Sequence, residues 1–233
     1  MTSDLLDELL RAIREKRPAV LATRLPDGRQ ELLFPTEEDK TQAGAEWPMA
    51  AARRALVEDE AITEACGDGS VFLRPYNPRV RLIVVGAVHI AAPLAELARP
   101  AGMDVVLVDP RTAFATADRF PGIELVHKWP EEALDTLRPD HRTAVVTLTH
   151  DEKLDDPALV AALSGPSFYI GALGSSRTHE KRTQRLRDQG VAEEDIARIQ
   201  APIGLSIGAR TPAEIAVAIL AEVVAHLRGA AQS

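Results

Sequence analysis

A polar tripeptide in the second half of the chain carries residue types that could do chemistry. Thr149, His150 and Asp151 directly follow the apolar run AVVTL. An imidazole between a hydroxyl and a carboxylate can exchange hydrogen bonds with a ligand or bind a metal ion. The six histidines of the chain show no metal-ligand spacing, so we expect no metal site. The alternative is a polar loop whose groups satisfy one another.

A second cluster lies in the stretch GALGSSRTHEKRTQRLR. Gly174 makes the exit from a strand flexible, and Ser175 or Ser176 can cap the helix that follows. Free N–H groups and the helix dipole at such a start attract an anion, and Arg177 stands beside them. Four more basic residues follow on the same helix: Lys181, Arg182, Arg185 and Arg187. The alternative for these outer residues is a solvated basic face.

A third cluster is the stretch GLSIGARTPAEIAVAIL. Thr211, Pro212 and Glu214 form a capping box that predicts a sharp helix start. Arg210 immediately precedes it, and its guanidinium could hold a phosphate or carboxylate through two hydrogen bonds. The alternative is an internal salt bridge that ties this helix to the sheet.

Cys66 is the only cysteine, so no disulfide can form within the chain, and a reducing compartment fits. It precedes a Gly-Asp-Gly turn, where a thiol could be exposed and reactive, or it could be a small buried apolar residue. No nucleophile–base pair can be recognised, and we assign no catalytic residue. The clusters favour a binding surface for an anionic cofactor over a complete hydrolytic site.

The stretch RLIVVGAVHIAAPLAELARPAGMDVVLVDPR predicts the start of a dinucleotide-binding unit. Gly86 supplies the first glycine of the phosphate-binding turn and Ala91 replaces the third, but Val88 stands where the second would be. Asp109 follows Gly86 by 23 residues, a suitable distance for a ribose-binding carboxylate. NAD(P) binding is therefore possible but weakened by Val88. The alternative is a unit kept for packing, with Asp109 as an ordinary acid at a strand end.

The elements that position these residues alternate between strand and helix. Apolar runs predict strands at LIVVG, DVVLVD, IELV, TAVVTLT and SFYIGAL. Helices are expected near His89–Ala98, Pro130–Leu137, Pro157–Leu163, Thr178–Gln189 and Pro212–Leu227. This alternation predicts an α/β fold in which a Rossmann-like parallel sheet carries helices on both faces.

The region before this sheet follows a different pattern. A helix capped by Ser3, a hairpin turn at Pro26-Asp27-Gly28, a polar stretch over 36–46, a helix starting at Pro48 and the strand SVFLRPY are expected. The boundary falls at Asn77–Arg79. We therefore predict a small N-terminal α+β domain over 1–78 and the Rossmann-like domain over 79–233.

Composition limits the classes of partner. The net charge of −8 and the 4% aromatic content argue against nucleic acid and against a membrane surface. No run is long enough to cross a bilayer, and the first residues do not read as a signal peptide. We expect a soluble cytoplasmic protein.

In these motifs the chain resembles the xanthine dehydrogenase accessory (XdhC/CoxI) family of molybdenum cofactor chaperones. The resemblance covers 81–229 and is most specific in YIGALGSSRTHEKRTQRL and IQAPIGLSIGARTPAEIAVAILAEV. The family's glycine turn falls on Gly86, its Thr-His-Asp element on 149–151, its Gly-Ser-x-Arg element on 174–177, and its Gly-Ala-Arg-Thr-Pro element on 208–212.

The resemblance implies a cofactor and a set of protein partners. It implies binding of the molybdenum cofactor, as molybdopterin or its dinucleotide form, and assistance with its maturation or insertion. The implied partners are an apo-molybdoenzyme of the xanthine dehydrogenase or carbon monoxide dehydrogenase type, a cysteine desulfurase, and a second copy of the chain in a homodimer.

The N-terminal region departs from the family. The family usually carries a Gly-Gly-Cys-Val-Glu element after its first hairpin, whereas the corresponding stretch LLFPTEEDKTQAGAEWPMAAARR is shortened and lacks a cysteine. A second family element, a cysteine followed by glycines, resembles CGDGSVFLRPY and retains Cys66. The missing element weakens a cysteine-based role in sulfuration.

Three functional hypotheses follow. The leading one is a non-catalytic carrier in which Arg177 and Arg210 share one cleft and neutralise the cofactor's phosphate. The alternatives are an NAD(P)-dependent oxidoreductase that uses Gly86 and Asp109, with a substrate near His150, and a ligand-free interaction protein in molybdoenzyme assembly.

Overall fold

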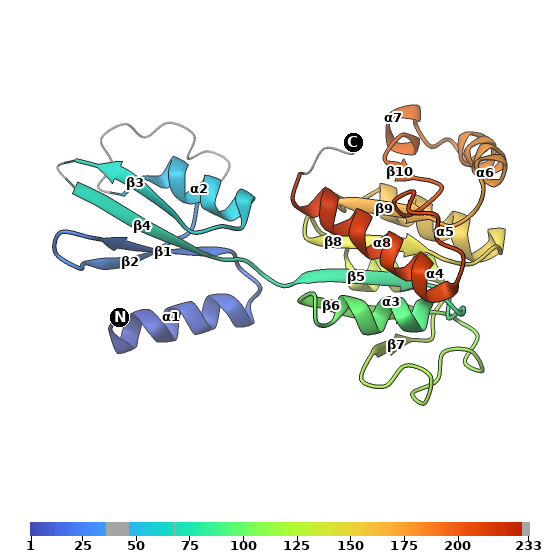
Figure 1. Cartoon of the computed structure of the whole chain (residues 1–233), viewed down its shortest axis with the longest axis horizontal. Helices are drawn as coiled ribbons and strands as arrows, with labels where there is room; N and C mark the ends of the chain where they lie inside the picture. Colours follow the sequence, from blue (N-terminus) through green and yellow to red (C-terminus); the bar gives the residue numbers. More distant parts are fainter. Residues whose placement is uncertain (36–46, 68, 230–233) are drawn as a thin grey trace. The chain divides into compact units, whose positions relative to one another are not determined.

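The computed structural model describes residues 1–35, 47–67 and 69–229, and it divides into two compact units, Met1–Pro78 and Arg79–Ser233 (Figure 1). The polar stretch expected over 36–46 lies outside the described residues. Each unit is built around its own sheet.

The N-terminal unit is a four-stranded antiparallel sheet in the order β2-β1-β4-β3. Its elements are α1 (Ser3–Arg14), β1 (Ala19–Arg24), β2 (Gln30–Leu33), α2 (Met49–Glu58), β3 (Ile62–Cys66) and β4 (Gly69–Tyr76). Figure 1 shows α1 and α2 on opposite faces of this sheet. Successive residues of β1 alternate between the faces, so Leu21 packs against α1 and Val20 packs against α2. Each face of the sheet therefore has its own helix and its own core.

The structure differs from the sequence prediction at two places in this unit. The cap of α1 is Thr2, whose hydroxyl accepts a hydrogen bond from the N–H of Leu5, and Ser3 is already helical, so the predicted Ser3 cap was wrong. Strand β3 was not predicted, because Ile62–Cys66 buries no residue fully and its apolar side chains only partly face the core. A short, half-exposed edge strand gives little periodic signal in a sequence.

The C-terminal unit is a six-stranded parallel sheet in the order β10-β9-β8-β5-β6-β7. Its strands are β5 (Val80–Val85), β6 (Met103–Val108), β7 (Glu124–Val126), β8 (Thr143–Thr147), β9 (Tyr169–Ala172) and β10 (Ile199–Gln200). The chain runs outward from β5 to β7, returns to the other side of β5, and then runs outward again from β8. The strand order reverses between β5 and β8, and this is where Rossmann-like sheets bind ligands.

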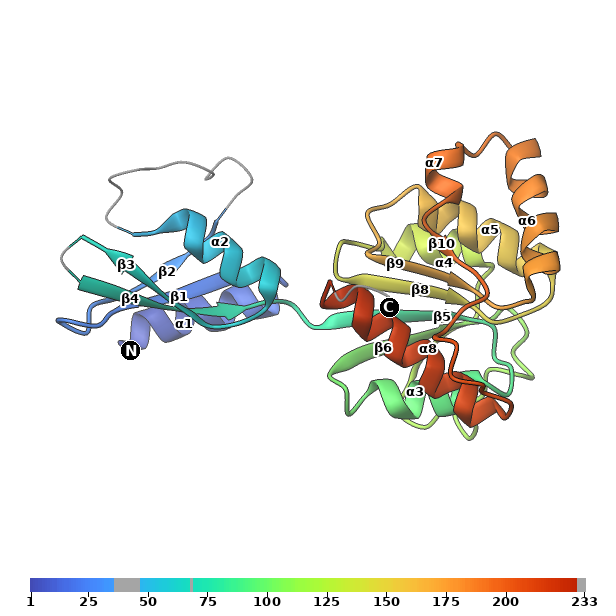
Figure 2. The same cartoon turned by 45° about the horizontal axis from the view of Figure 1, so that its top comes forward.

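Helices cover both faces of this sheet (Figure 2). They are α3 (Ala91–Ala98), α4 (Pro130–Leu137), α5 (Glu152–Leu163), α6 (Ser176–Asp188), α7 (Glu193–Ile196) and α8 (Pro212–Leu227). Leu82 and Val84 of β5 face the core under α3 and α8, whereas Ile83 and Val85 face α4 and α5. The continuous apolar run of β5 is thus explained by burial on both faces, as the sequence predicted.

Helix α5 starts more than one turn earlier than the sequence indicated. Helix α5 begins at Glu152 rather than at Pro157, because Asp151 caps it and accepts a hydrogen bond from the N–H of Lys153. Pro157 lies inside the helix. The short elements α7 and β10 were also not predicted, since four and two residues are too few to show a period.

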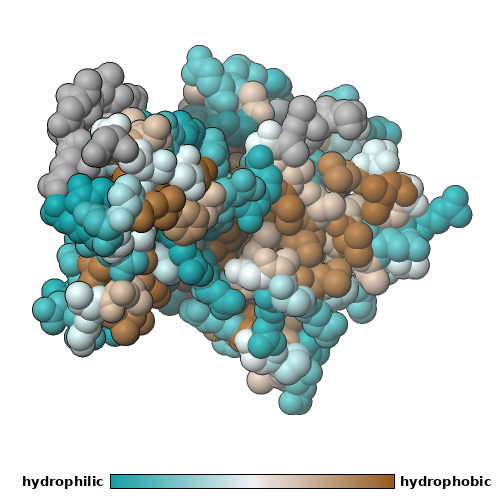
Figure 3. Space-filling view, turned by 60° about the vertical axis from the view of Figure 1, so that its left-hand side comes forward, coloured by the Kyte–Doolittle hydropathy of each residue, from teal (hydrophilic) through white to brown (hydrophobic). Residues whose placement is uncertain are grey.

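The outer side of α8 is apolar. Its exposed side chains include Val217, 47% exposed, and Val224, 37% exposed, and brown apolar surface extends over the C-terminal unit in Figure 3. Among the described residues, none of the helices combines the length and the apolar character required to cross a bilayer.

Candidate functional site

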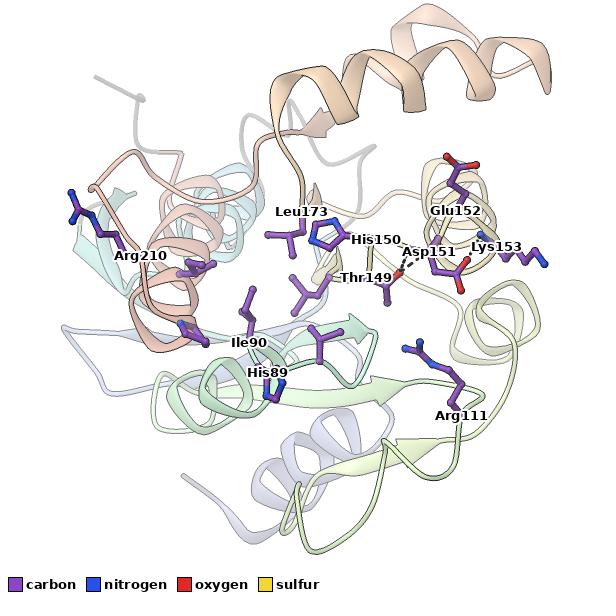
Figure 4. A pocket seen from close by; sticks show the side chains of 14 residues that line it. His89, Ile90, Arg111, Thr149, His150, Asp151, Glu152, Lys153, Leu173 and Arg210 are labelled. Carbon is purple, nitrogen blue, oxygen red and sulfur yellow. Dashed lines mark hydrogen bonds between the residues drawn. The ribbon is translucent and has the colours of Figure 1, made fainter.

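The larger cavity of the C-terminal unit lies where the strand order reverses. It has a volume of about 740 Å³ and is formed by the loops after β5, β6, β8 and β9 together with the start of α8 (Figure 4). A volume of this size lies within the range of small-molecule binding sites, ~300–1,000 Å³. Its apolar walls are Val88, Ile90, Leu148, Leu173, Pro212 and Ile215.

The glycine of the first turn serves packing. Gly86 has a φ of +106°, and a Cβ at this position would overlap the Cγ2 methyl of Thr149. Gly86 therefore allows the loop after β5 to lie directly against the loop after β8. It does not line the cavity, whereas Val88 does, at the position where a dinucleotide fold would carry its second glycine.

Asp109 lies fully buried beneath the cavity rather than in its wall. Its carboxylate accepts hydrogen bonds from the backbone N–H groups of Ala87 at 2.8 Å and Arg111 at 2.9 Å. It also accepts from Nε and Nη2 of Arg111, at 2.9 and 2.8 Å. A carboxylate offers about four acceptor positions, so no position is left for a ribose hydroxyl. This geometry does not support the expected ribose-binding role of Asp109.

The same contacts settle the charge state of Asp109. Burial alone would raise the pKa of Asp109, but the hydrogen bonds from the Arg111 side chain and from the backbone of Ala87 and Arg111 outweigh it, and the pKa is lowered. Asp109 therefore holds the first turn and the Arg111 side chain in one arrangement.

Arg111 is a site residue that the sequence reasoning missed. Its side chain is 38% exposed and points toward the cavity from the loop after β6 (Figure 4). The pKa of Arg111 is raised, first through its hydrogen bonds to Asp109. The only sequence signal was its place two residues after the strand-end acid.

The Thr-His-Asp element contains one buried residue, Thr149, and two residues at the cavity surface that are less buried, His150 and Asp151. Thr149 is buried; its hydroxyl donates to Oδ1 of Asp155 at 2.6 Å and accepts from the N–H of Asp151 at 3.1 Å. Asp151 caps α5 but still lines the cavity. His150 is exposed and stands in the middle of the cavity wall (Figure 4), so it is the member best placed to meet a ligand.

Arg210, just before α8, lines the edge of the same cavity, and its guanidinium points away from His150 and Leu173 (Figure 4). Thr211 accepts a hydrogen bond from the N–H of Glu214 at 3.3 Å, and Glu214 accepts from the N–H of Thr211 at 2.9 Å and of Arg210 at 2.7 Å. The predicted capping box is confirmed. Within the described part of the chain, the guanidinium of Arg210 has no ion-pair partner, so the expected alternative of an internal salt bridge is not found.

A second, smaller cavity of about 230 Å³ lies beside α6. It is lined by His150, Glu152, Asp155 and five residues of the helix: Arg177, Thr178, Lys181, Arg182 and Arg185. Ser175 caps α6 and accepts from the N–H of Thr178 at 3.3 Å. Gly174 precedes the cap with a φ of +137°, which favours glycine.

The expected common cleft for Arg177 and Arg210 is not found. Arg210 lines the larger cavity and Arg177 lines the smaller one, and the two cavities share His150 and Glu152. The spacing of the two arginines in the sequence could not reveal this, because α6 and α8 follow different strands.

Cys66 is not part of either cavity. It ends β3 in the N-terminal unit and packs, half-buried, against the core under α2. Both cavities are lined by residues of the C-terminal unit alone.

Comparison with known proteins places this site in a family. Residues 82–223 match the model of the XdhC Rossmann domain. "Molybdenum cofactor insertion chaperone PaoD" of Escherichia coli is 36% identical over 148 residues, which are 64% of this chain and 40% of that protein. A protein of Bacillus subtilis named as a probable xanthine dehydrogenase component is 34% identical over 156 residues, 66% of this chain and 45% of its own.

Two further relatives extend the comparison. "Uncharacterized protein YqeB" of Escherichia coli is 36% identical over 171 residues, 71% of this chain and 31% of that protein. The crystal structure of a xanthine dehydrogenase from Bacillus halodurans superimposes with a TM-score of 0.70 at 26% identity, covering 97% of this chain and 65% of that one. In sequence, the match spans less than half the length of PaoD, of the Bacillus subtilis protein and of YqeB.

The match to the Rossmann domain extends from β5 to α8 and includes every residue that lines the two cavities. On the strength of that match, the chain is a member of the XdhC family.

Proposed function

We propose that this protein binds the molybdenum cofactor in the larger cavity and assists its insertion into an apo-molybdoenzyme of the xanthine dehydrogenase type. The observation that carries the proposal is the cavity itself, at the switch point of an XdhC Rossmann domain. It has apolar walls, and its charged lining residues are three cations, Arg111, Lys153 and Arg210, and two acids, Asp151 and Glu152. A relative that is 36% identical bears the name of a molybdenum cofactor insertion chaperone. We infer a carrier rather than a catalyst.

The residues present fit a phosphorylated pterin. A flat ring system would lie between the apolar walls formed by Ile90, Leu173 and their neighbours. Arg111 points toward the cavity and would bind the phosphate of molybdopterin or the pyrophosphate of its dinucleotide form. Arg210 lies at the edge on a different loop and would reach the same group by turning its side chain inward. His150 would donate or accept hydrogen bonds at the polar edge of the ring. When bound, the cofactor would supply the redox chemistry of the client enzyme, and this chain would supply binding and shelter from water.

The oxidoreductase hypothesis has less support. Val88 lines the cavity where the backbone of a dinucleotide fold would approach a pyrophosphate, and Asp109 has no acceptor position left. Titration with NADH, followed by its fluorescence, separates the two hypotheses. Saturable binding at micromolar NADH would favour the oxidoreductase.

We also propose that the protein acts in a complex with other proteins. Its members are the client apo-enzyme, a cysteine desulfurase and a second copy of this chain. The apolar outer side of α8, with Val217 and Val224, supports a docking surface for a second copy. Light scattering of the purified chain and of the Val217→Glu variant tests self-association, and pull-down with the apo-enzyme and desulfurase tests the rest.

A loading and transfer assay tests the proposal as a whole. Purified chain is mixed with cofactor released from a denatured molybdoenzyme, and retained pterin is measured by fluorescence after gel filtration. Loaded chain is then added to apo-enzyme, and recovered activity is measured. We expect retention and faster recovery with the wild type, and at least tenfold weaker retention with Arg210→Ala.

Lys128→Ala provides the matched control for that assay. Lys128 is a cationic residue of the same unit that pairs with Glu132 on the surface, outside both cavities. Its loss should leave retention unchanged. Retention that is absent in the wild type, or equal in wild type and Arg210→Ala, would remove the basis of the proposal.

A further inference from the structure

We infer that the smaller cavity is a binding site for a phosphate-type oxyanion, held by Arg182 together with Arg177 and Lys181 at the start of α6. The inference does not depend on which cofactor occupies the larger cavity. It rests on the contacts, charges and size of the smaller cavity.

Arg182 is the first observation. It lines the cavity and is only 2% exposed, yet among its nitrogens only Nη2 has a hydrogen bond, to the carbonyl of Leu173 at 2.9 Å. Nε and Nη1 are buried without any partner. The nearest carboxylate, Asp155, lies 3.6 Å from Nη2. Buried donors without acceptors cost about 1–3 kcal/mol each and more on charged groups, and the described part of the chain supplies no acceptor for these two nitrogens.

The balance of charge is the second observation. Four cationic side chains line the cavity against two carboxyl groups, those of Glu152 and Asp155. Arg185 is already neutralised, at 3.0 Å from Glu152 and 2.5 Å from Asp156. Arg177 and Lys181 have no ion-pair partner in the part of the chain that the structure describes. A chain with a net charge of −8 thus carries two unpaired cations, Arg177 and Lys181, side by side in this cavity.

Helix α6 adds its own attraction for an anion. It has 13 residues, and Ser175 satisfies only the N–H of Thr178 in the first turn. The N–H groups of Ser176 and Arg177 precede the first intrahelical bond and remain available. The first turn contains no acid, although acids are favoured there. Arg177 and Lys181, four residues apart, extend from the same face of the helix.

The size of the cavity defines the ligand class. A volume of about 230 Å³ is below the usual range for drug-sized ligands but ample for one tetrahedral oxyanion and its oxygen-linked carbon. Buried arginine and oriented N–H groups recognise a phosphate or phosphate monoester. Such a group could be the free phosphate ion. It could also be one end of a ligand in the larger cavity, because the two cavities share the lining residues His150 and Glu152.

Titration with inorganic phosphate tests the inference. Heat of binding is measured for the full chain at constant ionic strength, with chloride replaced by phosphate. We expect saturable binding at one site by the wild type and at least tenfold weaker binding by Arg177→Ala/Lys181→Ala. Arg187→Ala is the matched control, because Arg187 lies on the same helix but pairs with Glu193 outside the cavity.

Two further variants locate the ion. Arg210→Ala removes a cation that lines the larger cavity and not the smaller one, so it should weaken phosphate binding less than the double variant does. If it weakens binding as much as the double variant does, the ion lies in the larger cavity and the inference is wrong. Arg182→Lys keeps a buried positive charge but loses the planar guanidinium. This variant, shown by circular dichroism to be folded, should bind phosphate more weakly than the wild type does. Absence of saturable binding by the wild type, or equal binding by the double variant, would equally overturn the inference.

The two sources of phosphate are separated by competition. If the site takes one end of a ligand from the larger cavity, 5′-phosphorylated nucleotides should displace phosphate and bind more tightly than it. If the site takes the free ion, phosphate should bind more tightly than these esters. Because no molybdenum cofactor is used, failure here leaves the loading assay of the proposed function unaffected.

Discussion

Gly86 and Thr149 show how single residues shape the floor of the larger cavity. The glycine adopts a φ of +106° and leaves space for the methyl group of Thr149. The hydroxyl of Thr149 in turn donates a hydrogen bond to Asp155, in the first turn of α5. Two loops that follow neighbouring strands are thereby fixed against each other. The wall residues Val88 and His150, which follow these two positions, are placed by that packing.

Gly86→Ala should therefore destabilise the protein. A Cβ would overlap the Thr149 methyl and force a strained backbone, so we expect a loss of about 2–4 kcal/mol in the free energy of unfolding, measured by urea denaturation. Gly102→Ala is the control, since Gly102 also has a positive φ of +85° but nothing within 4 Å of its Cβ position. Adding Thr149→Ser should recover part of the Gly86→Ala loss. An equal loss in both glycine variants would contradict a special role for the close approach.

Asp155 is a buried carboxyl whose charge depends on pH near neutrality. Burial raises its pKa to about 7, against lowering contributions from the Thr149 hydroxyl and Arg182. Asp156 also contributes to this raised pKa, and Arg111 and Arg185 interact with Asp155 electrostatically. The ordinary value of 3.8 applies to the unfolded chain, so the folded state holds this proton more tightly between pH 3.8 and about 7.

The sign of the effect on stability follows. Protonation of Asp155 favours the folded state, and this contribution is lost as pH rises through about 7. Between pH 5.5 and pH 8 the wild type should lose up to about 2 kcal/mol relative to Asp155→Asn, which cannot titrate at this position. The measurement is urea denaturation of both proteins at the two pH values. A constant difference between the two proteins would contradict the raised pKa.

At the scale of elements, the start of α8 connects stability to binding. The capping box of Thr211 and Glu214 fixes the backbone of Arg210, and Arg210 lines the larger cavity. Thr211→Ala should cost about 1 kcal/mol in unfolding free energy and should also weaken cofactor retention, because the first turn that positions Arg210 frays. Thr211→Ser keeps the hydroxyl and is the control. Cofactor retention that is unchanged in Thr211→Ala would show that the cap does not position Arg210.

The sequence predicted those elements whose signals are local. The apolar run of β5, the Ser175 cap and the capping box at Thr211 depend on neighbouring residues, and the structure has all three. Short elements such as β3 and β10 were missed because their stability comes from pairing with distant strands.

The candidate site was predictable only in part for the same reason. Thr149, His150 and Asp151 follow a strand that the sequence showed clearly. Arg111 and Arg182 were not singled out, because their roles depend on burial and on partners such as Asp109 and Asp155, which only the folded chain brings together. The separation of Arg177 from Arg210 into different cavities likewise depends on where α6 and α8 lie.

At the scale of the whole molecule, the two compact units predict independent folding. Both cavities are lined by the unit Arg79–Ser233, whose two cores are its own. We expect residues 79–233 expressed alone to unfold cooperatively on heating, and to bind inorganic phosphate as the full chain does if the inference for α6 holds. Calorimetry of the fragment and of the full chain makes the comparison. A fragment without a cooperative transition would show that the N-terminal unit is required for folding.

The central claim is that the larger cavity holds the molybdenum cofactor, and blocking that cavity tests it most directly. Leu173→Trp places a larger side chain in the cavity wall, and Val57→Trp places the same side chain on the exposed side of α2, outside both cavities. The measurement is the amount of pterin retained by each purified variant after loading and gel filtration. The account predicts that Leu173→Trp loses retention while Val57→Trp retains as much as the wild type. Equal retention by Leu173→Trp, folded as judged by circular dichroism, would contradict it.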